Sequence, residues 1–180
     1  MARALSLVLH PFGVFMGLAL VAAWRLDPPS LPRVATGMAV VVGIAWGFAW
    51  RRWRSGRWST VDASRPQERP VLYLLALVLA IGYWRWLGGG ASPLSGGVLA
   101  AVAMLCAAGL ANRWIKLSLH LASLAFAGIV LLAVWRPAGC ALLALVPALA
   151  WSRLALGRHR LEEVVGGALL GGAAGWMAVA

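Results

Sequence analysis

The sequence has 180 residues, of which 62% are hydrophobic and only 12% are charged, whereas a typical soluble domain is about half apolar and about a quarter charged. This composition excludes an ordinary water-soluble domain and indicates a single membrane-embedded bundle over residues 1–180. The formal net charge is +11. Because the arginines lie in short clusters between apolar segments, they favour membrane topology and anionic lipid headgroups over nucleic acid as the partner.

Seven apolar segments follow one another along the chain, at 4–24, 34–50, 71–87, 94–112, 117–135, 138–151 and 161–180. A helix needs about 20 apolar residues to cross the hydrocarbon of a bilayer. The sixth segment is short and contains Pro147, so it is expected to tilt, to include flanking residues or to cross incompletely. The sequence therefore predicts an all-α, polytopic membrane bundle of six or seven transmembrane helices. Small residues in the last segment are expected to let helices approach closely: Gly166, Gly167, Gly171, Gly172 and Gly175.

Basic residues are distributed unevenly between the two sides of such a bundle. With seven crossings, one side holds the N-terminus and the connections 51–70, 113–116 and 152–160, and segment 51–70 forms a basic interfacial loop within the domain. That side carries twelve Lys and Arg: Arg3, Arg51, Arg52, Arg54, Arg57, Arg65, Arg69, Arg113, Lys116, Arg153, Arg158 and Arg160. The other side carries four: Arg25, Arg33, Arg85 and Arg136. This asymmetry predicts that the first side is cytoplasmic.

The titratable residues that are the best candidates for a functional site fall on that same basic side. His120 lies just inside the fifth apolar segment, His159 lies just before the last one, and Arg65 and Arg69 end the basic loop. Ionisable groups gathered at one membrane boundary indicate a functional site. We therefore expect these residues to converge.

One motif combines several of these residues at fixed spacing. Residues 152–167 have the form S-R-x5-H-x3-E-V-x2-G, with Arg153, His159 and Glu163 as its reactive members. This resembles the third signature of the type 2 phosphatidic acid phosphatase family, which usually reads S-R-x5-H-x3-D. Glu163 stands where the family usually has aspartate, so the carboxylate is kept.

Two further segments resemble the other signatures of that family less closely. Lys116, Ser118 and His120 have the form K-x-S-x-H, similar to the P-S-G-H signature and to its variant in small bacterial members. Arg69 and the proline after it match the end of K-x6-R-P, but Asp62 occupies the lysine position. The stretch 62–70 looks more like the arginine-rich variant of isoprenoid-lipid phosphatases, and Arg65 belongs to that variant.

The resemblance implies a metal-independent phosphatase without a cofactor. His159 would be the nucleophile that forms a phosphohistidine, and Glu163 would orient its ring, since residues four apart share a helix face. His120 would act as the general acid that protonates the leaving lipid. The implied phosphate-binding residues are Arg153, Arg69, Arg65, Lys116 and Ser118.

The implied substrate is a phosphate monoester or diphosphate on a lipid in a bacterial plasma membrane. A cytoplasmic site favours a biosynthetic intermediate of the cell envelope, such as decaprenylphosphoryl-phosphoribose phosphate. Polyprenyl diphosphate, phosphatidate and phosphatidylglycerophosphate remain open. Two other functions also remain open, a lipid-phosphate transporter or flippase and a catalytically inactive family member. His10 is interpreted as an interfacial residue, and the oligomeric state is left open.

Overall fold

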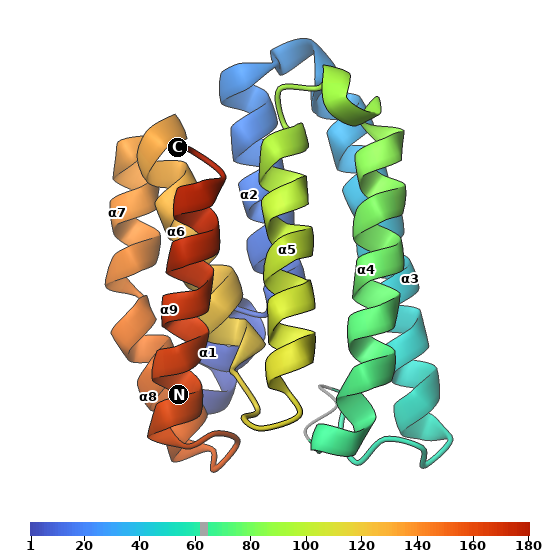
Figure 1. Ribbon diagram of the computed structural model, residues 1–180, viewed down its shortest axis with the longest axis vertical. Helices are drawn as coiled ribbons and strands as arrows, with labels where there is room; N and C mark the ends of the chain where they lie inside the picture. The colour runs from blue at the N-terminus through green and yellow to red at the C-terminus, as the bar shows by residue number, and fades with distance from the viewer. Residues whose placement is uncertain (62–64) are drawn as a thin grey trace.

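The computed structural model describes residues 1–61 and 65–180, and every regular element within them is a helix, which confirms the all-α prediction (Figure 1). The α-helices are α1 (Ala2–Val8), α2 (Pro11–Leu26), α3 (Leu31–Arg54), α4 (Arg69–Trp86), α5 (Ser95–Ala111), α6 (Leu119–Val134), α7 (Arg136–Ala144), α8 (Val146–Ala155) and α9 (Leu161–Met177). Short 3₁₀ helices lie at Pro28–Ser30, Pro66–Glu68 and Gly89–Ala91. The long helices run side by side along the longest axis of the molecule.

Each apolar segment of the sequence coincides with a helix, and two of these helices are broken near a proline. Proline lacks the N–H that an α-helix requires in its interior. At Pro11 the chain bends by 43° between α1 and α2. Near Pro147 the sixth segment divides into α7 and α8, and it includes flanking residues so that it extends over Arg136–Ala155.

Length and composition identify fewer membrane spans than the seven apolar segments. Among the described residues, two helical stretches are long and apolar enough to cross a membrane, Pro28–Arg54 and Arg136–Ala155, and α1 with α2 makes a third if the bent pair is one span. Helices α5 and α6 are apolar but shorter. Large apolar side chains also cover the outside of several helices, as at Leu74, Val78 and Leu169, which are 64%, 59% and 68% exposed.

Helix α6 forms the centre of the core and packs most closely against α9. Three glycines of α9 at four-residue spacing, Gly167, Gly171 and Gly175, allow this contact. A Cβ at Gly167 would lie 2.5 Å from the carbonyl oxygen of Ser118, and one at Gly171 would overlap the carbonyl of Ala122. Backbone therefore lies directly on backbone, which fixes the start of α6 against the start of α9.

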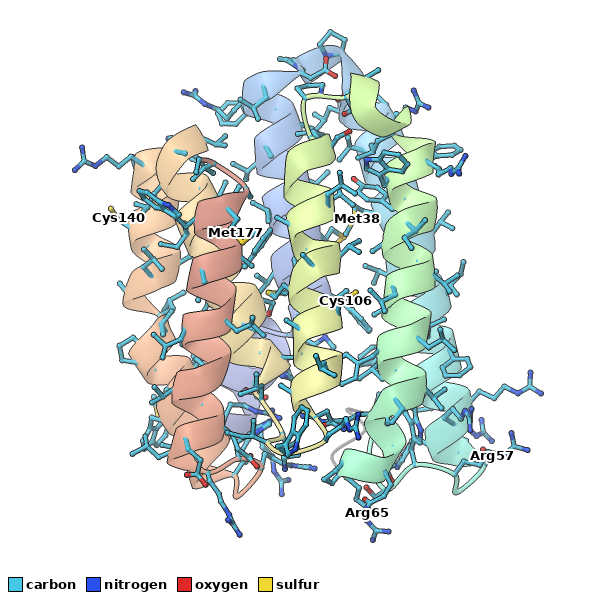
Figure 2. All side chains as sticks on the ribbon, in the orientation of Figure 1. Met38, Arg57, Arg65, Cys106, Cys140 and Met177 are labelled. Carbon is cyan, nitrogen blue, oxygen red and sulfur yellow. The ribbon has the colours of Figure 1, made fainter. Side chains whose placement is uncertain are left out.

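The connections that carry the predicted site residues gather at one end of the bundle. Helix α1 and the connections α3–α4, α5–α6 and α8–α9 all lie at the lower end in Figure 1. The labelled side chains of Arg57 and Arg65 lie at the same end in Figure 2. The fold thus brings together segments that are far apart in the sequence.

The glycine contact between α6 and α9 gives a paired stability test. Gly171→Ala is expected to lower the free energy of unfolding by about 1–3 kcal/mol, because the added methyl group meets backbone that cannot rotate away. Gly172→Ala is the control, since nothing lies within 4 Å of a Cβ there, and it should be neutral or stabilising because alanine favours a helix. Thermal unfolding in detergent measures both. Equal midpoints for the two variants would contradict the close packing.

Candidate active site

The start of α9 brings His159 and Glu163 together. Gly157 has a φ of +61°, a backbone conformation that suits glycine, and it turns the chain between α8 and His159. Nδ1 of His159 lies 2.8 Å from Oε2 of Glu163. The same Oε2 accepts a hydrogen bond of 3.2 Å from the backbone N–H of Arg160 and so caps the first turn of α9. Glu163 therefore both begins the helix and orients the imidazole.

The His159 ring is neutral near neutral pH. Burial lowers the pKa of its imidazole to about 3. The positive charges of Arg69, Arg153 and Lys116 add to this lowering of the pKa, and a hydrogen bond with the Lys116 backbone opposes it. Because Nδ1 faces the Glu163 carboxylate, the single proton of the ring belongs on Nδ1 and leaves the lone pair on Nε2. This is the form that an attacking nitrogen requires.

Two buried arginines lie near this ring. Arg69, 4% exposed, donates from Nη1 to the carbonyl oxygen of Leu117 at 2.7 Å. Arg153, 3% exposed, donates from Nη1 to Oγ of Ser6 at 2.5 Å. Within the described residues, Nε of Arg69 is buried without a hydrogen-bond partner. Since a buried charge is costly unless it is paired, the Arg69 guanidinium is a candidate group for binding an anion.

Lys116 and Ser118, from the connection between α5 and α6, lie close to the same cluster. Nζ of Lys116 donates to the carbonyl oxygen of Arg158 at 2.8 Å and lies 3.8 Å from Oε2 of Glu163. Burial lowers the pKa of Lys116. Ser118 is fully buried, and its Oγ has no hydrogen-bond partner among the described residues. Its N–H donates to the backbone carbonyl of Glu163 at 3.0 Å, so the two motifs are joined directly.

His120 lies on the first turn of α6, two residues after Ser118. Its side chain is buried, with the residue only 5% exposed, and its backbone carbonyl accepts from the Ser123 hydroxyl at 3.0 Å. Its ring centroid lies 5.2 Å from that of His10, with the two planes at 85°. His120 and Arg153 both line the main cavity of the bundle.

The structure does not bring Arg65 to this cluster. Arg65 is exposed before the 3₁₀ helix Pro66–Glu68, where Oε2 of Glu68 accepts from its backbone N–H at 3.2 Å. It lines a second hollow of about 360 Å³ together with Arg52 and Arg57. The short helix separates Arg65 from Arg69, the first residue of α4, which points into the bundle and lines the main cavity. Asp62, at the lysine position of the first signature, lies outside the described residues.

The N-terminal segment contributes two residues that the sequence motifs do not identify. Ser6 on α1 contacts Arg153, and His10 at the break before α2 contacts His120. A signal for His10 does exist in the sequence, since it is a titratable residue followed by proline inside an apolar segment. Ser6 offers no such signal, because a lone serine in an apolar helix is common in helix packing.

A cavity of about 500 Å³ opens from the polar cluster into the apolar bundle. Its polar wall consists of His10, Arg69, His120 and Arg153. Its other lining side chains are almost entirely apolar, and they extend to the far ends of α2, α4 and α9: Leu26, Leu87 and Val179. The cavity therefore combines a charged end with a long apolar interior, as a binding site for an amphipathic molecule requires.

Within residues 1–61 and 65–180, no group of three His, Cys, Asp or Glu side chains is arranged to hold a metal ion. The comparisons with family models, curated proteins and solved structures found no match for this chain.

The neutral state of His159 predicts a pH dependence of stability. Its folded-state pKa of about 3 lies below the ordinary value of 6.5, so protonation favours the unfolded chain. The stabilisation is complete above about pH 6.5 and is lost as the pH falls towards about 3. In His159→Asn, which cannot titrate there, thermal unfolding midpoints should fall less between about pH 6.5 and about pH 4. Parallel declines in both proteins would contradict this account.

Proposed function

We propose that this protein is a membrane-embedded lipid phosphatase that removes a phosphate group through a phosphohistidine on His159. The observation that carries the proposal is one arrangement: a neutral imidazole oriented by Glu163, with the cations of Arg69 and Arg153 close enough to lower its pKa. Phosphoryl transfer requires a placed nucleophile and neutralised charge, and this arrangement supplies both. The three short motifs support the same chemistry.

The lipid nature of the substrate is supported by the cavity and by the surface. The charged end of the cavity suits a phosphate, and its apolar interior suits a hydrocarbon tail. A bundle with large apolar side chains on its outside is suited to a bilayer. With α1–α2 and α7–α8 counted once each, the described helices form seven rods. We propose that six or seven of these cross a bacterial plasma membrane.

In the first step, Nε2 of His159 attacks phosphorus, and the bond from phosphorus to the lipid oxygen breaks. Arg69, Arg153 and the Ser118 hydroxyl bind the phosphoryl oxygens as negative charge develops. His120 gives a proton to the departing oxygen, so that the lipid leaves as an alcohol, or as a lipid monophosphate when the substrate is a diphosphate. Glu163 stabilises the positive charge that His159 acquires.

In the second step, water attacks the phosphohistidine. His120, now neutral, accepts a proton from that water. The bond between phosphorus and Nε2 breaks, inorganic phosphate leaves, and both histidines return to their starting states. Lys116 has a supporting part, since it lies 3.8 Å from Glu163 and balances the charge of that carboxylate.

The membrane face on which the site lies narrows the choice of substrate. The connections that carry the site residues lie at the same end of the bundle as the labelled Arg57 and Arg65 of the basic loop (Figures 1 and 2), and the positive-inside rule favours a cytoplasmic location for that end. A cytoplasmic site favours a lipid phosphate made on the inner leaflet during synthesis of the cell envelope. A polyprenyl-phosphoryl-sugar phosphate, such as decaprenylphosphoryl-phosphoribose phosphate, is our first candidate, ahead of polyprenyl diphosphate.

Phosphate release by the purified protein in detergent tests the proposal. We expect release from at least one lipid in a panel measured with EDTA: a polyprenyl phosphate, a polyprenyl diphosphate, a polyprenyl-phosphoribose phosphate, phosphatidate and phosphatidylglycerophosphate. His159→Ala should abolish release because it removes the nucleophile. Arg160→Ala is the matched control, since that neighbouring side chain is 83% exposed, and it should retain activity. No release from any lipid by folded protein would favour an inactive or a transport protein.

Glu163→Gln tests the role of the carboxylate separately. Glutamine also caps a helix at this position, so the fold should survive, but it cannot stabilise the charged imidazole. We expect kcat to fall by about 10²–10⁴, as expected when the acid of a catalytic triad is replaced by its amide. Steady-state rates beside thermal unfolding midpoints provide the measurement. A normal kcat would show that Glu163 serves only as the helix cap.

A further inference from the structure

His10 occupies a fixed position at the break between α1 and α2. Pro11 follows it, and the two helices meet there at 43°. Nδ1 of His10 accepts a hydrogen bond of 3.3 Å from the backbone N–H of Phe12, so the side chain caps the N-terminus of α2. This bond sets the orientation of the ring. It also places the proton of the neutral ring on Nε2.

The other side of the His10 ring lies against His120. The two centroids are 5.2 Å apart and the planes meet at 85°, an edge-to-face arrangement. Trp46 of α3 and Phe12 surround the same ring, with centroids 5.7 Å and 4.7 Å from that of His10. Both imidazoles line the main cavity, at its charged end. The His10 ring is thus held between a helix cap and the histidine that we assign as the general acid.

We infer that His10 is a positioning residue that holds the His120 ring at the angle needed to protonate the leaving lipid. This inference rests on the proposed function. The torsion that turns an imidazole about its bond to Cβ has broad minima, while a general acid must lie within hydrogen-bond reach of the atom it protonates. The hydrogen bond from the Phe12 N–H fixes the His10 ring, and the edge-to-face contact with that fixed ring limits rotation of the His120 ring.

The same segment also contacts the phosphate-binding machinery. Ser6 of α1 accepts a hydrogen bond from Arg153, and the Ser152 hydroxyl donates to the carbonyl oxygen of Ala2 at 2.7 Å. The first ten residues therefore contact both a proposed phosphate ligand and the proposed general acid. His10 is the member of this segment that lies against the acid.

Two substrates with different leaving groups can distinguish a positioning role of His10 from a merely structural one. A lipid alkoxide is a poor leaving group and depends on the proton from His120, whereas the nitrophenolate of p-nitrophenyl phosphate leaves without it. Losing the His10 ring should therefore slow the lipid reaction selectively. General loss of structure would reduce turnover of both substrates equally.

The experiment compares two replacements of His10 that separate its two contacts. His10→Asn keeps a good N-cap but removes the ring, and His10→Phe keeps a ring but cannot accept the cap bond. On the best lipid monoester of the panel, His10→Asn should lower kcat by about tenfold to about 10²-fold with little change in KM, since misplacement of a catalytic group by about 1 Å has an effect of that size. On p-nitrophenyl phosphate its kcat should fall less than threefold by the same argument. His10→Phe should lose less lipid activity than His10→Asn.

Two controls make the outcome decisive. Val14→Ala removes buried apolar atoms one turn further along α2, and it should change both substrates to the same small extent. The double variant His10→Asn, His120→Asn should be no slower on the lipid than His120→Asn alone, because residues that act as a unit are not additive. Equal losses on both substrates, or additive losses in the double variant, would overturn the inference. An inactive wild type would overturn the proposed function as well, whereas an active one with equal losses overturns the inference alone.

Discussion

The carboxylate of Glu163 joins the local structure of the site to its chemistry. It caps the first turn of α9 through the Arg160 amide and fixes the tautomer of His159. The backbone carbonyl of Glu163 accepts a hydrogen bond from the N–H of Ser118, which ties the start of α6 to the start of α9. Because one residue makes all three contacts, the His159 ring, the helix start and the neighbouring motif share one geometry. The glycine contacts further along α9 keep that geometry in place.

The burial of positive charge is a second constraint on the site, beside the contacts of Glu163. Arg69 and Arg153 are almost fully buried, and burying charge is unfavourable in the absence of compensating interactions. Their charges also lower the pKa of His159, so the same cations that would bind the phosphate of the proposed substrate keep the free imidazole unprotonated. Donors such as Nε of Arg69 and Oγ of Ser118 lack partners within the described residues. A phosphate group would supply what these donors and charges need.

The sequence predicted the all-helical fold and the pairing of His159 with Glu163, but it did so by expecting both residues on one helix face. In the structure His159 lies before the N-cap of α9, and the pair meets because the Glu163 side chain reaches back from the first turn. The sequence also predicted close helix contacts at both Gly171 and Gly172. The contact exists at Gly171, but nothing lies within 4 Å of a Cβ at Gly172, because the rotation of the helix about its axis decides which glycine faces α6. Short motifs could not separate Arg65 from Arg69, since a 3₁₀ helix between them decides which side chain enters the bundle. The contact of His10 with His120, the contact of Ser6 with Arg153 and the cavity all join segments far apart in the chain, which no local pattern encodes.

One part of the bundle is tightly packed, whereas another part lines the cavity. Helices α6 and α9 pack backbone against backbone. His120 lies on the first turn of α6 and His159 lies just before α9, so this packing orders the two histidines of the proposed reaction. Helices α2, α3, α4 and α5 supply much of the wall of the cavity, where variable apolar chains can be accommodated without fixed partners. Arg69 is the first residue of α4 and His10 is the N-cap of α2, and both line the polar end of the cavity. In the proposed reaction, this arrangement would align a lipid tail in the cavity with the phosphate group that His159 attacks.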